Sequence, residues 1–488
     1  MKKVVVMLVF TSLVIVCMTG LPGFAESEYE KWQREELNSF SEFRDKRDKE
    51  FTSYLKKQWH EFRLFKGDKF YDKPKPSRLP VAKKRPPEKT PPIKGKIIKK
   101  VSLPLPPKKI KPRRTAQAPP AVKKGKPLKL DFYGLSLGFS YDPGIKIRPG
   151  GKIDKNSISS FWEVLSKSDY EGLIKQVKYY KKELKLNDWG YHLLVYKVGE
   201  RIYKRSQNGA VMFTWFILSK SGYEARIGYN NDSVHLLLPS TQALFSVPYL
   251  TFSGKKFYAV SFDGRRKKLG SLYTYKGSYP DARRVMNYEI KNVPEITKVV
   301  MNRRLKFDYR GKGFSIPVRY DKGVVDYFKY YPQTDIEVYF GASISRDADS
   351  SLVKGLKPLV EGKTEGEAVN IILRLVQTSF KYKTDDNQFG REKYMLPEET
   401  LFYPFSDCED RAVLFAYLVN KLIGLDVVGL HYPNHIATAV KFSSNIRGDS
   451  IIYKGRKYTI CDPTYINADI GAAMPQFKKV NPKVIRFI

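Results

Sequence analysis

The sequence predicts an α+β protein built from more than one domain. With 488 residues, the chain is longer than a single hydrophobic core normally supports, so two or three domains joined by linkers are expected. Helix-like and strand-like segments both occur. Ser157 to Leu186 and Thr364 to Phe380 have the apolar spacing of helices, whereas Tyr249 to Phe262 and Phe307 to Phe340 are rich in aromatic and β-branched residues. Helices and strands together are expected in an α+β fold.

The first 25 residues have the pattern of a signal peptide. An apolar run from Val4 to Thr19 follows two lysines, and Gly23-Phe24-Ala25 provides small residues for cleavage before Glu26. Cys17 follows a valine, which disfavours lipidation. We expect an exported protein that is periplasmic, held in the cell envelope or secreted.

Residues 26–65 are expected to form one helix with an aromatic stripe. Two series of rings recur every 11 residues, and 11 residues nearly complete three helical turns. The series are Tyr29, Phe40, Phe51, Phe62 and Trp32, Phe43, Tyr54, Phe65. Such a stripe must be covered. Packing against the protein's own domains or a second copy is favoured over binding to an envelope surface.

Residues 66–129 have the composition of a basic, proline-rich linker. The segment contains 22 Lys and Arg against 3 Asp and Glu, and 14 of the 30 prolines of the chain. About half of the formal net charge of +38 therefore lies here. We expect an extended, semi-rigid spacer that is also attracted to anionic cell-wall or membrane surfaces.

The two halves of the remaining chain contain an apparent internal repeat. Ala210 to Ile217 matches Ala412 to Val419 without a gap, and a two-residue shift then aligns His235 with His435. We therefore expect a degenerate copy over 130–269, a β-rich connecting segment over 270–350 and a functional copy over 351–488. In the degenerate copy, Ser206, His235 and Phe262 occupy the positions of Cys408, His435 and Asp462. Chance similarity between two buried helices is the alternative.

Cys408 is the candidate nucleophile. It follows Asp407, a good N-cap, and precedes the apolar run Ala412 to Leu418, with Asp410 at capping-box spacing. This places the thiol in the first turn of a long buried helix, where backbone N–H groups and the helix dipole favour the thiolate. Cys461 is interpreted as a buried, unreactive side chain, so no disulfide is expected.

His435 and Asp462 are the candidate base and orienting group. His435 stands at the entrance of a predicted strand, and Asp462 ends another strand just before Pro463. Adjacent strands would hold the two side chains together, facing the start of the Cys408 helix. A nucleophile, a base and an orienting group in this arrangement indicate acyl transfer through a Cys-His-Asp triad.

These motifs resemble the transglutaminase-like superfamily, and in particular the bacterial transglutaminase-like cysteine proteinases. The resemblance covers 380–465 and is carried by Asp407 to Ala412, the strand that starts at His435, the Cys461-Asp462-Pro463-Thr464 ending and Tyr394 to Leu401. It implies a papain-like fold, in which a helix bearing the cysteine packs on an antiparallel sheet. It also implies that Cys408 is the nucleophile, His435 the general base and acid, and Asp462 its orienter. Ser406-Asp407 departs from the family, where many members have a glycine before the Asp-Cys pair.

The expected activity is therefore that of a thiol peptidase or amidase acting on protein or peptide amides of the envelope. A protein-crosslinking transglutaminase and a non-catalytic envelope scaffold are the alternatives. No cofactor or metal is expected, although Asp407 and Glu409 could join a calcium site. Gln388 is a candidate for a second oxyanion donor, but a solvent-exposed loop amide is the favoured interpretation. Nucleic acid is not an expected partner, and the sequence leaves the oligomeric state open.

Overall fold

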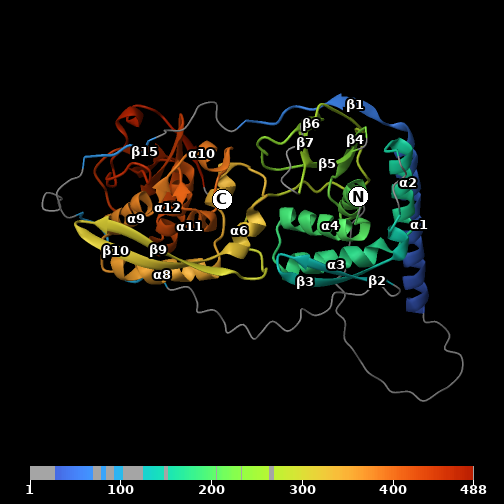
Figure 1. Ribbon diagram of the computed structural model, residues 1–488, viewed down its shortest axis with the longest axis horizontal. Coiled ribbons are helices and arrows are strands. Elements are labelled where there is room, and N and C mark those ends of the chain that lie inside the picture. The colour runs from blue at the N-terminus through green and yellow to red at the C-terminus, as the bar shows by residue number, and fades with distance from the viewer. Residues whose placement is uncertain are drawn as a thin grey trace, which may run out of the picture. The chain divides into compact units, whose positions relative to one another are not determined.

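The computed structural model describes residues 28–69, 78–83, 93–102, 125–147, 152–204, 206–231, 233–262 and 269–486. The expected signal peptide, most of the 66–129 segment and the turn at Asp263-Gly264 lie outside these residues. The chain divides into two compact units, Met1–Glu50 and Phe51–Ile488, which are described separately. Helices and sheets occur together in the second unit, which confirms the α+β class (Figure 1).

The N-terminal helix is shorter than the sequence predicted. Helix α1 runs over Glu28–Lys57, and strand β1 (His60–Arg63) follows it. The predicted helix to residue 65 is therefore wrong at its end, because β1 pairs with β8 (Ser271–Thr274) and forms the edge of a sheet. Phe62 lies in β1 and packs against Phe252, with ring centroids 5.1 Å apart. Tertiary pairing here overrides the helical period.

The aromatic stripe is divided between the two units. In the first unit Tyr29, Trp32, Phe40 and Phe43 are exposed. In the second unit Phe51 is buried against Trp162, with ring centroids 4.7 Å apart. Only part of the stripe is thus covered by the protein's own core.

The first half of the second unit consists of a hairpin, four α-helices and a six-stranded antiparallel sheet (Figure 1). The hairpin is β2 (Lys126–Phe132) and β3 (Leu135–Tyr141), followed by a short 3-10 turn, η2 (Pro143–Ile145). The helices are α2 (Lys155–Ser166), α3 (Tyr170–Glu183), α4 (Asp188–Tyr203) and α5 (Gln207–Lys220). The sheet has the order β1-β8-β4-β5-β7-β6, with β4 (Arg226–Asn230), β5 (Ser233–Pro239), β6 (Tyr249–Phe252) and β7 (Lys255–Val260).

The second half repeats this plan. It opens with the hairpin β9 (Val300–Tyr309) and β10 (Lys312–Asp321) and continues through helices and two short strands. These are α6 (Lys322–Phe328), α7 (Ile336–Phe340), α8 (Arg346–Val360), α9 (Glu365–Ser379), β11 (Lys381–Tyr382), α10 (Asp385–Phe389), α11 (Pro397–Phe402), β12 (Phe405–Ser406) and α12 (Cys408–Ile423). The five-stranded sheet β15-β16-β14-β13-β17 closes the half. Its strands are β13 (Asp426–Tyr432), β14 (His435–Lys441), β15 (Ser450–Tyr453), β16 (Arg456–Cys461) and β17 (Lys483–Ile485), with η3 (Pro475–Phe477) before β17.

Two predicted segments, one helical and one strand-rich, have different outcomes. The predicted helix over 364–380 forms as α9, and the Thr364 hydroxyl accepts the Glu367 N–H at 3.3 Å. The strand-rich expectation for 307–340 is wrong in its second part, where α6 and α7 form. Asp321 explains the change, because its carboxylate accepts the Gly323 N–H at 2.9 Å and starts α6.

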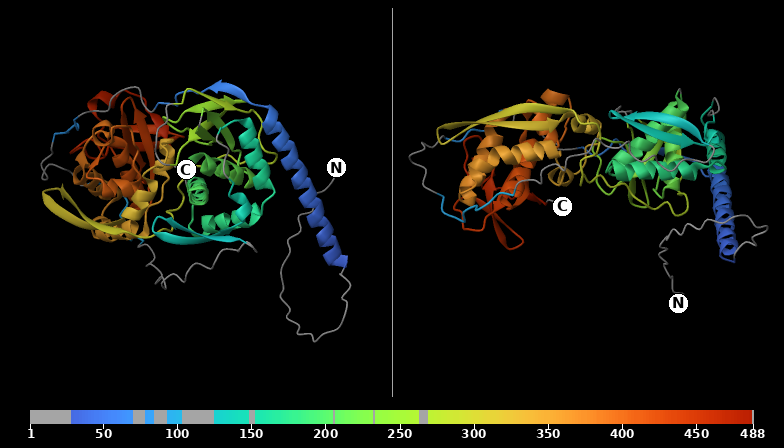
Figure 2. Two further views of the ribbon diagram at one scale, coloured as in Figure 1. Left: turned by 45° about the vertical axis from the view of Figure 1, so that its right-hand side comes forward. Right: turned by 90° about the horizontal axis from the view of Figure 1, so that it is seen from below.

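The two sheets share one strand order. Strands β8-β4-β5-β7-β6 of the first half correspond to β17-β13-β14-β16-β15 of the second, and all described pairings in both sheets are antiparallel. In each half a long helix, α5 or α12, directly precedes the central hairpin. Figure 2 shows the two halves from two further sides. The shared order agrees with the internal repeat seen in the sequence.

The described parts of the expected linker are not a free spacer. The Ala82 N–H donates to the Ile466 carbonyl at 2.8 Å, and the Ile98 N–H donates to the Lys363 carbonyl at 2.9 Å. Residues 126–129 belong to β2. Segments 78–83 and 93–102 therefore bind along the second half, contrary to a role of simple reach.

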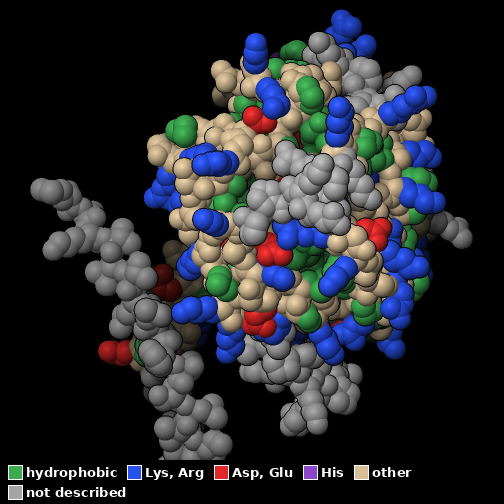
Figure 3. Space-filling view, turned by 90° about the vertical axis from the view of Figure 1, so that its left-hand side faces the viewer, with side chains coloured by type: hydrophobic (Ala, Val, Ile, Leu, Met, Phe, Trp, Pro, Cys, Tyr) green, Lys and Arg blue, Asp and Glu red, His purple; other side chains and the backbone are tan. Residues whose placement is uncertain are grey.

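One face of the molecule is rich in basic side chains. In Figure 3, lysine and arginine side chains are spread over the face shown, and acidic side chains are few. No helix among the described residues has the length and hydrophobicity needed to span a bilayer.

Candidate active site

Cys408 is the first residue of α12, as the capping pattern predicted. The Asp410 carboxylate accepts the N–H of Asp407 at 3.1 Å and the N–H of Met395 at 2.9 Å. These bonds fix the start of the helix against the segment that precedes α11. The Cys408 side chain is 1% exposed, and its thiol donates to a Glu409 carboxylate oxygen at 3.0 Å.

Arg411 anchors the first turn of α12 from inside the core. Its guanidinium donates to the Ser406 hydroxyl at 3.1 Å, the Phe380 carbonyl at 2.8 Å and the Gln377 carbonyl at 3.3 Å. Burial lowers the pKa of Arg411 to about 10, so the side chain remains cationic at neutral pH. This role was not predicted, because an arginine three positions after a cysteine gives no sign of being buried.

Replacing Arg411 with methionine is expected to lower the free energy of unfolding by about 3–5 kcal/mol. The variant would leave the buried carbonyls of Gln377 and Phe380 without these donors. Urea unfolding measures the change. Arg319→Met is the matched control, because the Arg319 side chain is 52% exposed and its loss should cost no more than about 0.5 kcal/mol. Equal effects of the two substitutions would contradict the anchoring role.

His435 and Asp462 lie in direct contact. His435 Nε2 is 2.8 Å from Asp462 Oδ2, and both side chains are buried. The other carboxylate oxygen of Asp462 accepts the N–H groups of Thr464 at 2.9 Å and Tyr465 at 3.2 Å. The His435 ring stacks on Phe477, with centroids 5.3 Å apart. The carboxylate is thus fixed by backbone donors and in turn fixes the imidazole.

The hydrogen bond to Asp462 determines which ring nitrogen of His435 can act as a base. In the neutral imidazole, Nε2 donates to the carboxylate, so Nδ1 carries the lone pair. Nδ1 is buried and has no hydrogen-bond partner among the residues that the structure describes. This nitrogen is therefore free to accept a proton, although no hydrogen bond joins it to Cys408.

The chain path places Cys408 and His435 at the same end of the helix–sheet layer. Helix α12 has 16 residues and is about 24 Å long, and the seven residues of β13 span about 23 Å in the reverse direction. Only Gly424 and Leu425 separate them. The end of β13 and the start of β14 therefore return to the level of the first turn of α12.

Gln377, on α9, holds the loop that follows Asp462. Its side-chain amide donates to the carbonyls of Asp462 at 3.1 Å, Tyr465 at 2.7 Å and Ala468 at 3.0 Å. The backbone carbonyl of Gln377 also accepts from Arg411. One segment therefore positions both the cysteine helix and the aspartate loop. This positioning residue was not predicted, since its helix spacing resembles ordinary core packing.

Several carboxylates surround the start of α12. Asp385, Asp407 and Asp410 form one trio, and Asp385, Glu392 and Glu409 another, with ligand atoms within 4.8 Å in each. These residues are the ones that could hold a calcium ion. Asp385 also accepts the Lys393 N–H at 2.9 Å, and Asp410 accepts two N–H groups, so the cluster already holds the chain before the helix.

Gln388 differs from the exposed loop amide that the sequence suggested. It lies in α10, and its Nε2 atom is buried with no hydrogen-bond partner within the described residues. Helix α10 starts at Asp385, whose carboxylate is within 4.8 Å of that of Glu409. Helix α10 thus carries a buried amide donor that has no described partner. The first residue of this helix, Asp385, lies close to Glu409, the residue next to Cys408.

Glu398 has a strongly perturbed acidity near the site. Its carboxylate accepts the N–H of Asp321 at 2.5 Å and the N–H and hydroxyl of Ser345 at 2.8 and 2.7 Å. Burial raises its pKa from 4.5 to about 6. The side chain ties α11 to the end of β10 and the start of α8.

The raised pKa predicts a pH dependence of stability. The folded protein binds this proton more tightly than the unfolded chain, so the contribution of Glu398 to stability is greatest below pH 4.5 and falls as the pH rises to 6. The loss amounts to about 2 kcal/mol. The difference in unfolding free energy between the wild type and Glu398→Gln, which cannot titrate, should fall by about 1.5 kcal/mol of this amount between pH 4.5 and 6.5. A difference that is independent of pH would contradict the assignment.

The strand registers change the expected counterparts of the triad in the first half. Asn230 pairs with Ser233 across one two-residue turn, and Tyr432 pairs with His435 across the other. Ser233, not His235, therefore corresponds to His435. The next pairing gives the same kind of result. Leu236 pairs with Val260 in the first half, and the equivalent pair in the second half is Thr438 and Cys461. Ser261, not Phe262, therefore corresponds to Asp462. The two-residue shift in the sequence alignment was wrong, because only backbone pairing defines register.

Comparison of the chain with models of known protein families, with curated proteins and with solved structures gives no match.

Proposed function

We propose that the second half of the chain is a papain-like, transglutaminase-like thiol domain that transfers acyl groups through Cys408, His435 and Asp462. The observation that carries this proposal is the buried 2.8 Å contact between His435 and Asp462, at the end of the sheet where α12 begins with Cys408. A cysteine at a helix start and a histidine oriented by a carboxylate are the parts that such chemistry requires.

The proposed reaction uses each residue in a defined step. His435 Nδ1 takes the thiol proton, and the Cys408 sulfur attacks the amide carbonyl. The Cys408 N–H and the Gln388 side-chain amide hold the oxyanion that forms. His435 then gives its proton to the departing amine, which leaves a thioester on Cys408. Water hydrolyses this thioester to a free acid, or an amine converts it to a new amide.

The described geometry requires the site to open before it can react. Cys408 is 1% exposed and His435 and Asp462 are each 2% exposed, so no substrate can reach them in this arrangement. Phe477 covers the His435 ring, and residues 78–83 pair with the loop after Asp462. The Cys408 thiol, which now donates to the Glu409 carboxylate, must also turn to donate its proton to His435.

A non-catalytic scaffold is the second candidate function. The burial of the three side chains and the bond from the Cys408 thiol to Glu409 favour it. In both cases the expected signal peptide and the basic segments indicate work in the cell envelope. The proposed substrates of the enzyme are envelope proteins or peptides.

The direct test is to incubate the protein with envelope fractions beside a Cys408→Ala control. New cleavage products or new crosslinks that appear only with the wild type would support acyl transfer and distinguish its two outcomes. Identical fractions in both incubations, repeated after truncation of residues 78–102 to open the site, would favour the scaffold.

A further inference from the structure

A large cavity in the second unit, apart from Cys408, is lined by the first half together with residues 330–333 and 391 of the second half. Its volume is about 730 Å³, within the range of about 300–1,000 Å³ typical of small-ligand pockets. It borders the end of the sheet where β5 begins and β7 ends, and Gln207, Val234 and Ser261 are in its lining. Ser261 is the counterpart of Asp462. Gln207 and Val234 lie next to Ser206 and Ser233, the counterparts of Cys408 and His435. The copy without the triad therefore has a cavity at the equivalent position.

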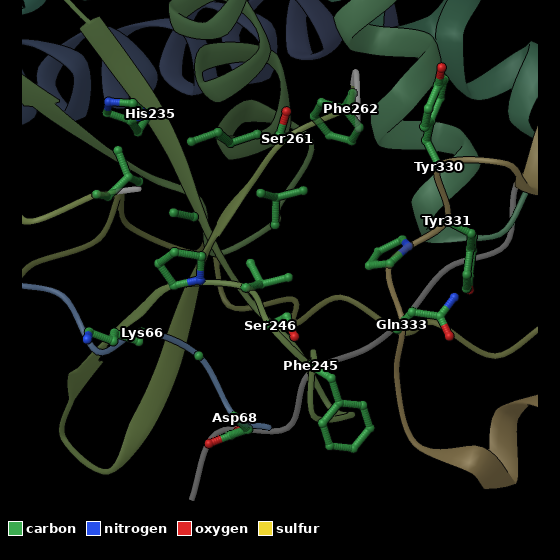
Figure 4. A pocket seen from close by; sticks show the side chains of 18 of the residues that line it. Lys66, Asp68, His235, Phe245, Ser246, Ser261, Phe262, Tyr330, Tyr331 and Gln333 are labelled. Atoms are coloured by element: carbon green, nitrogen blue, oxygen red, sulfur yellow. The ribbon is translucent and has the colours of Figure 1, made fainter. Parts of the chain in front are cut away.

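The walls of the cavity are held by backbone hydrogen bonds. The Ser246 N–H donates to the Asp68 carbonyl at 2.8 Å, and the Phe245 N–H donates to the Gln333 carbonyl at 2.9 Å. Gly67 has a φ of +97°, and a Cβ there would lie 2.7 Å from the Val247 carbonyl oxygen, so only glycine permits this approach. In Figure 4, Ser261 and Phe262 face Tyr331 and Gln333 across the open space. The cavity is thus built from fixed segments.

The charge of the lining favours an anion. Lys66, Lys69 and Arg391 contribute three cationic side chains, and Asp68 is the single acidic residue of the described lining. Its carboxylate pairs with Lys256 Nζ at 2.6 Å, which offsets its charge. A ligand with several carboxylates would meet complementary charge on entering.

The remaining lining fits a peptide. Tyr196 stacks on Phe262 with ring centroids 5.2 Å apart, and Phe245 and Tyr331 add further aromatic surface. Amide and hydroxyl groups that can pair with a peptide backbone lie between the rings, on Gln207, Ser246, Ser261 and Gln333. We propose that this cavity binds a short acidic peptide, with its carboxylates at Lys66, Lys69 and Arg391 and its apolar side chains against the aromatic rings.

One wall of the cavity is also connected to the Cys408 helix. The Tyr394 N–H donates to Gln333 Oε1 at 2.7 Å, and the next residue, Met395, donates to Asp410 in the first turn of α12. The peptide site contains none of the three proposed catalytic residues, so it does not depend on catalysis by Cys408.

Fluorescence anisotropy of a labelled peptide tests the proposal with the full chain. The probe is fluorescein-Asp-Phe-Glu-Leu-Glu, and its matched control is the amide form fluorescein-Asn-Phe-Gln-Leu-Gln. We expect the acidic peptide to bind at least about tenfold more tightly than the amide peptide, because charge-assisted hydrogen bonds are lost with the carboxylates. Arg391→Gln and the pair Lys66→Gln with Lys69→Gln should each weaken binding about tenfold.

Control variants separate the cavity from the rest of the molecule. Lys454→Gln removes an exposed charge from the β15–β16 turn and should leave the affinity unchanged. Cys408→Ala should bind as the wild type does, which keeps this test independent of the enzymatic proposal. Ser261→Trp fills the cavity and should abolish binding while circular dichroism shows an intact fold. Ser261→Ala serves as its smaller counterpart and should retain binding.

Four results would overturn the proposal. They are equal affinity for the acidic and amide peptides, undiminished binding to folded Ser261→Trp, no effect of Arg391→Gln, and displacement of the peptide by a long-chain fatty acid that binds more tightly. The last result would assign the cavity to an amphipathic carboxylate other than a peptide.

Discussion

Replacing His435 with alanine is expected to lower the rate of amide cleavage at neutral pH by about 10²–10⁴-fold. In the proposed mechanism the imidazole takes the proton from the thiol and gives it to the leaving amine, and its Nε2 atom is the one that contacts Asp462. The rate is measured as the release of cleavage products from envelope fractions.

His431→Ala is the matched control for this loss. His431 lies on β13, the neighbouring strand of the same hairpin, where it pairs with Ile436. Its removal should change the rate by less than about threefold, as for a side chain without a catalytic role. Equal losses in both variants would indicate a general effect of the hairpin on folding.

Replacing Asp462 with asparagine is expected to lower the same rate by about 10²–10⁴-fold, through the tautomer of His435. An asparagine amide can present its N–H₂ group to Nε2, which would move the ring proton to Nδ1 and remove the base. The backbone N–H groups of Thr464 and Tyr465 can donate only to an oxygen at the other position, which enforces this orientation.

Measuring the unfolding free energy beside the rate distinguishes this effect from simple destabilisation. If Asp462→Asn acts through the tautomer, the unfolding free energy should change much less than the rate, and Gln377→Ala should lower both together, since Gln377 holds the loop. A rate for Asp462→Asn within threefold of the wild type would remove Asp462 from the proposed mechanism.

The site residues were accessible to sequence reasoning because their signals are local. A capping pattern around Asp407 and Asp410 sets the start of α12, and strand ends at His435 and Asp462 follow from short apolar runs. The α9 helix was predicted for the same reason, from Thr364 and Glu367. Each depends on neighbours within four residues.

Features that depend on distant residues were not predicted. Helix α1 stops at Lys57 because β8, more than two hundred residues later, offers strand pairing to His60–Arg63. The counterparts of His435 and Asp462 required strand registers. An alignment based on helical composition missed the counterpart of His435 by two residues and that of Asp462 by one. The cavity combines side chains from Lys66 to Arg391, which no local pattern connects.

The burial of the triad was also beyond the sequence. Phe477 covers His435 from the chain segment before β17, and residues 78–83 reach the Asp462 loop from a proline-rich stretch that predicted only a spacer. Polar residues in a motif predict chemistry, and the exposure of those residues depends on packing by remote segments.

The measurement that tests the central claim most directly is the rate at which iodoacetamide alkylates Cys408. It needs no substrate, and a Cys17→Ser, Cys461→Ser background leaves Cys408 as the single thiol. Burial already raises the pKa of Cys461 well above its usual range, so that position should not react. If His435 activates the thiol once the site opens, His435→Ala should slow alkylation at pH 7 by at least about tenfold, and the difference should vanish above pH 10, where the thiolate forms without a base. Equal rates at pH 7 with and without His435 would contradict the triad and leave α12 as part of a scaffold.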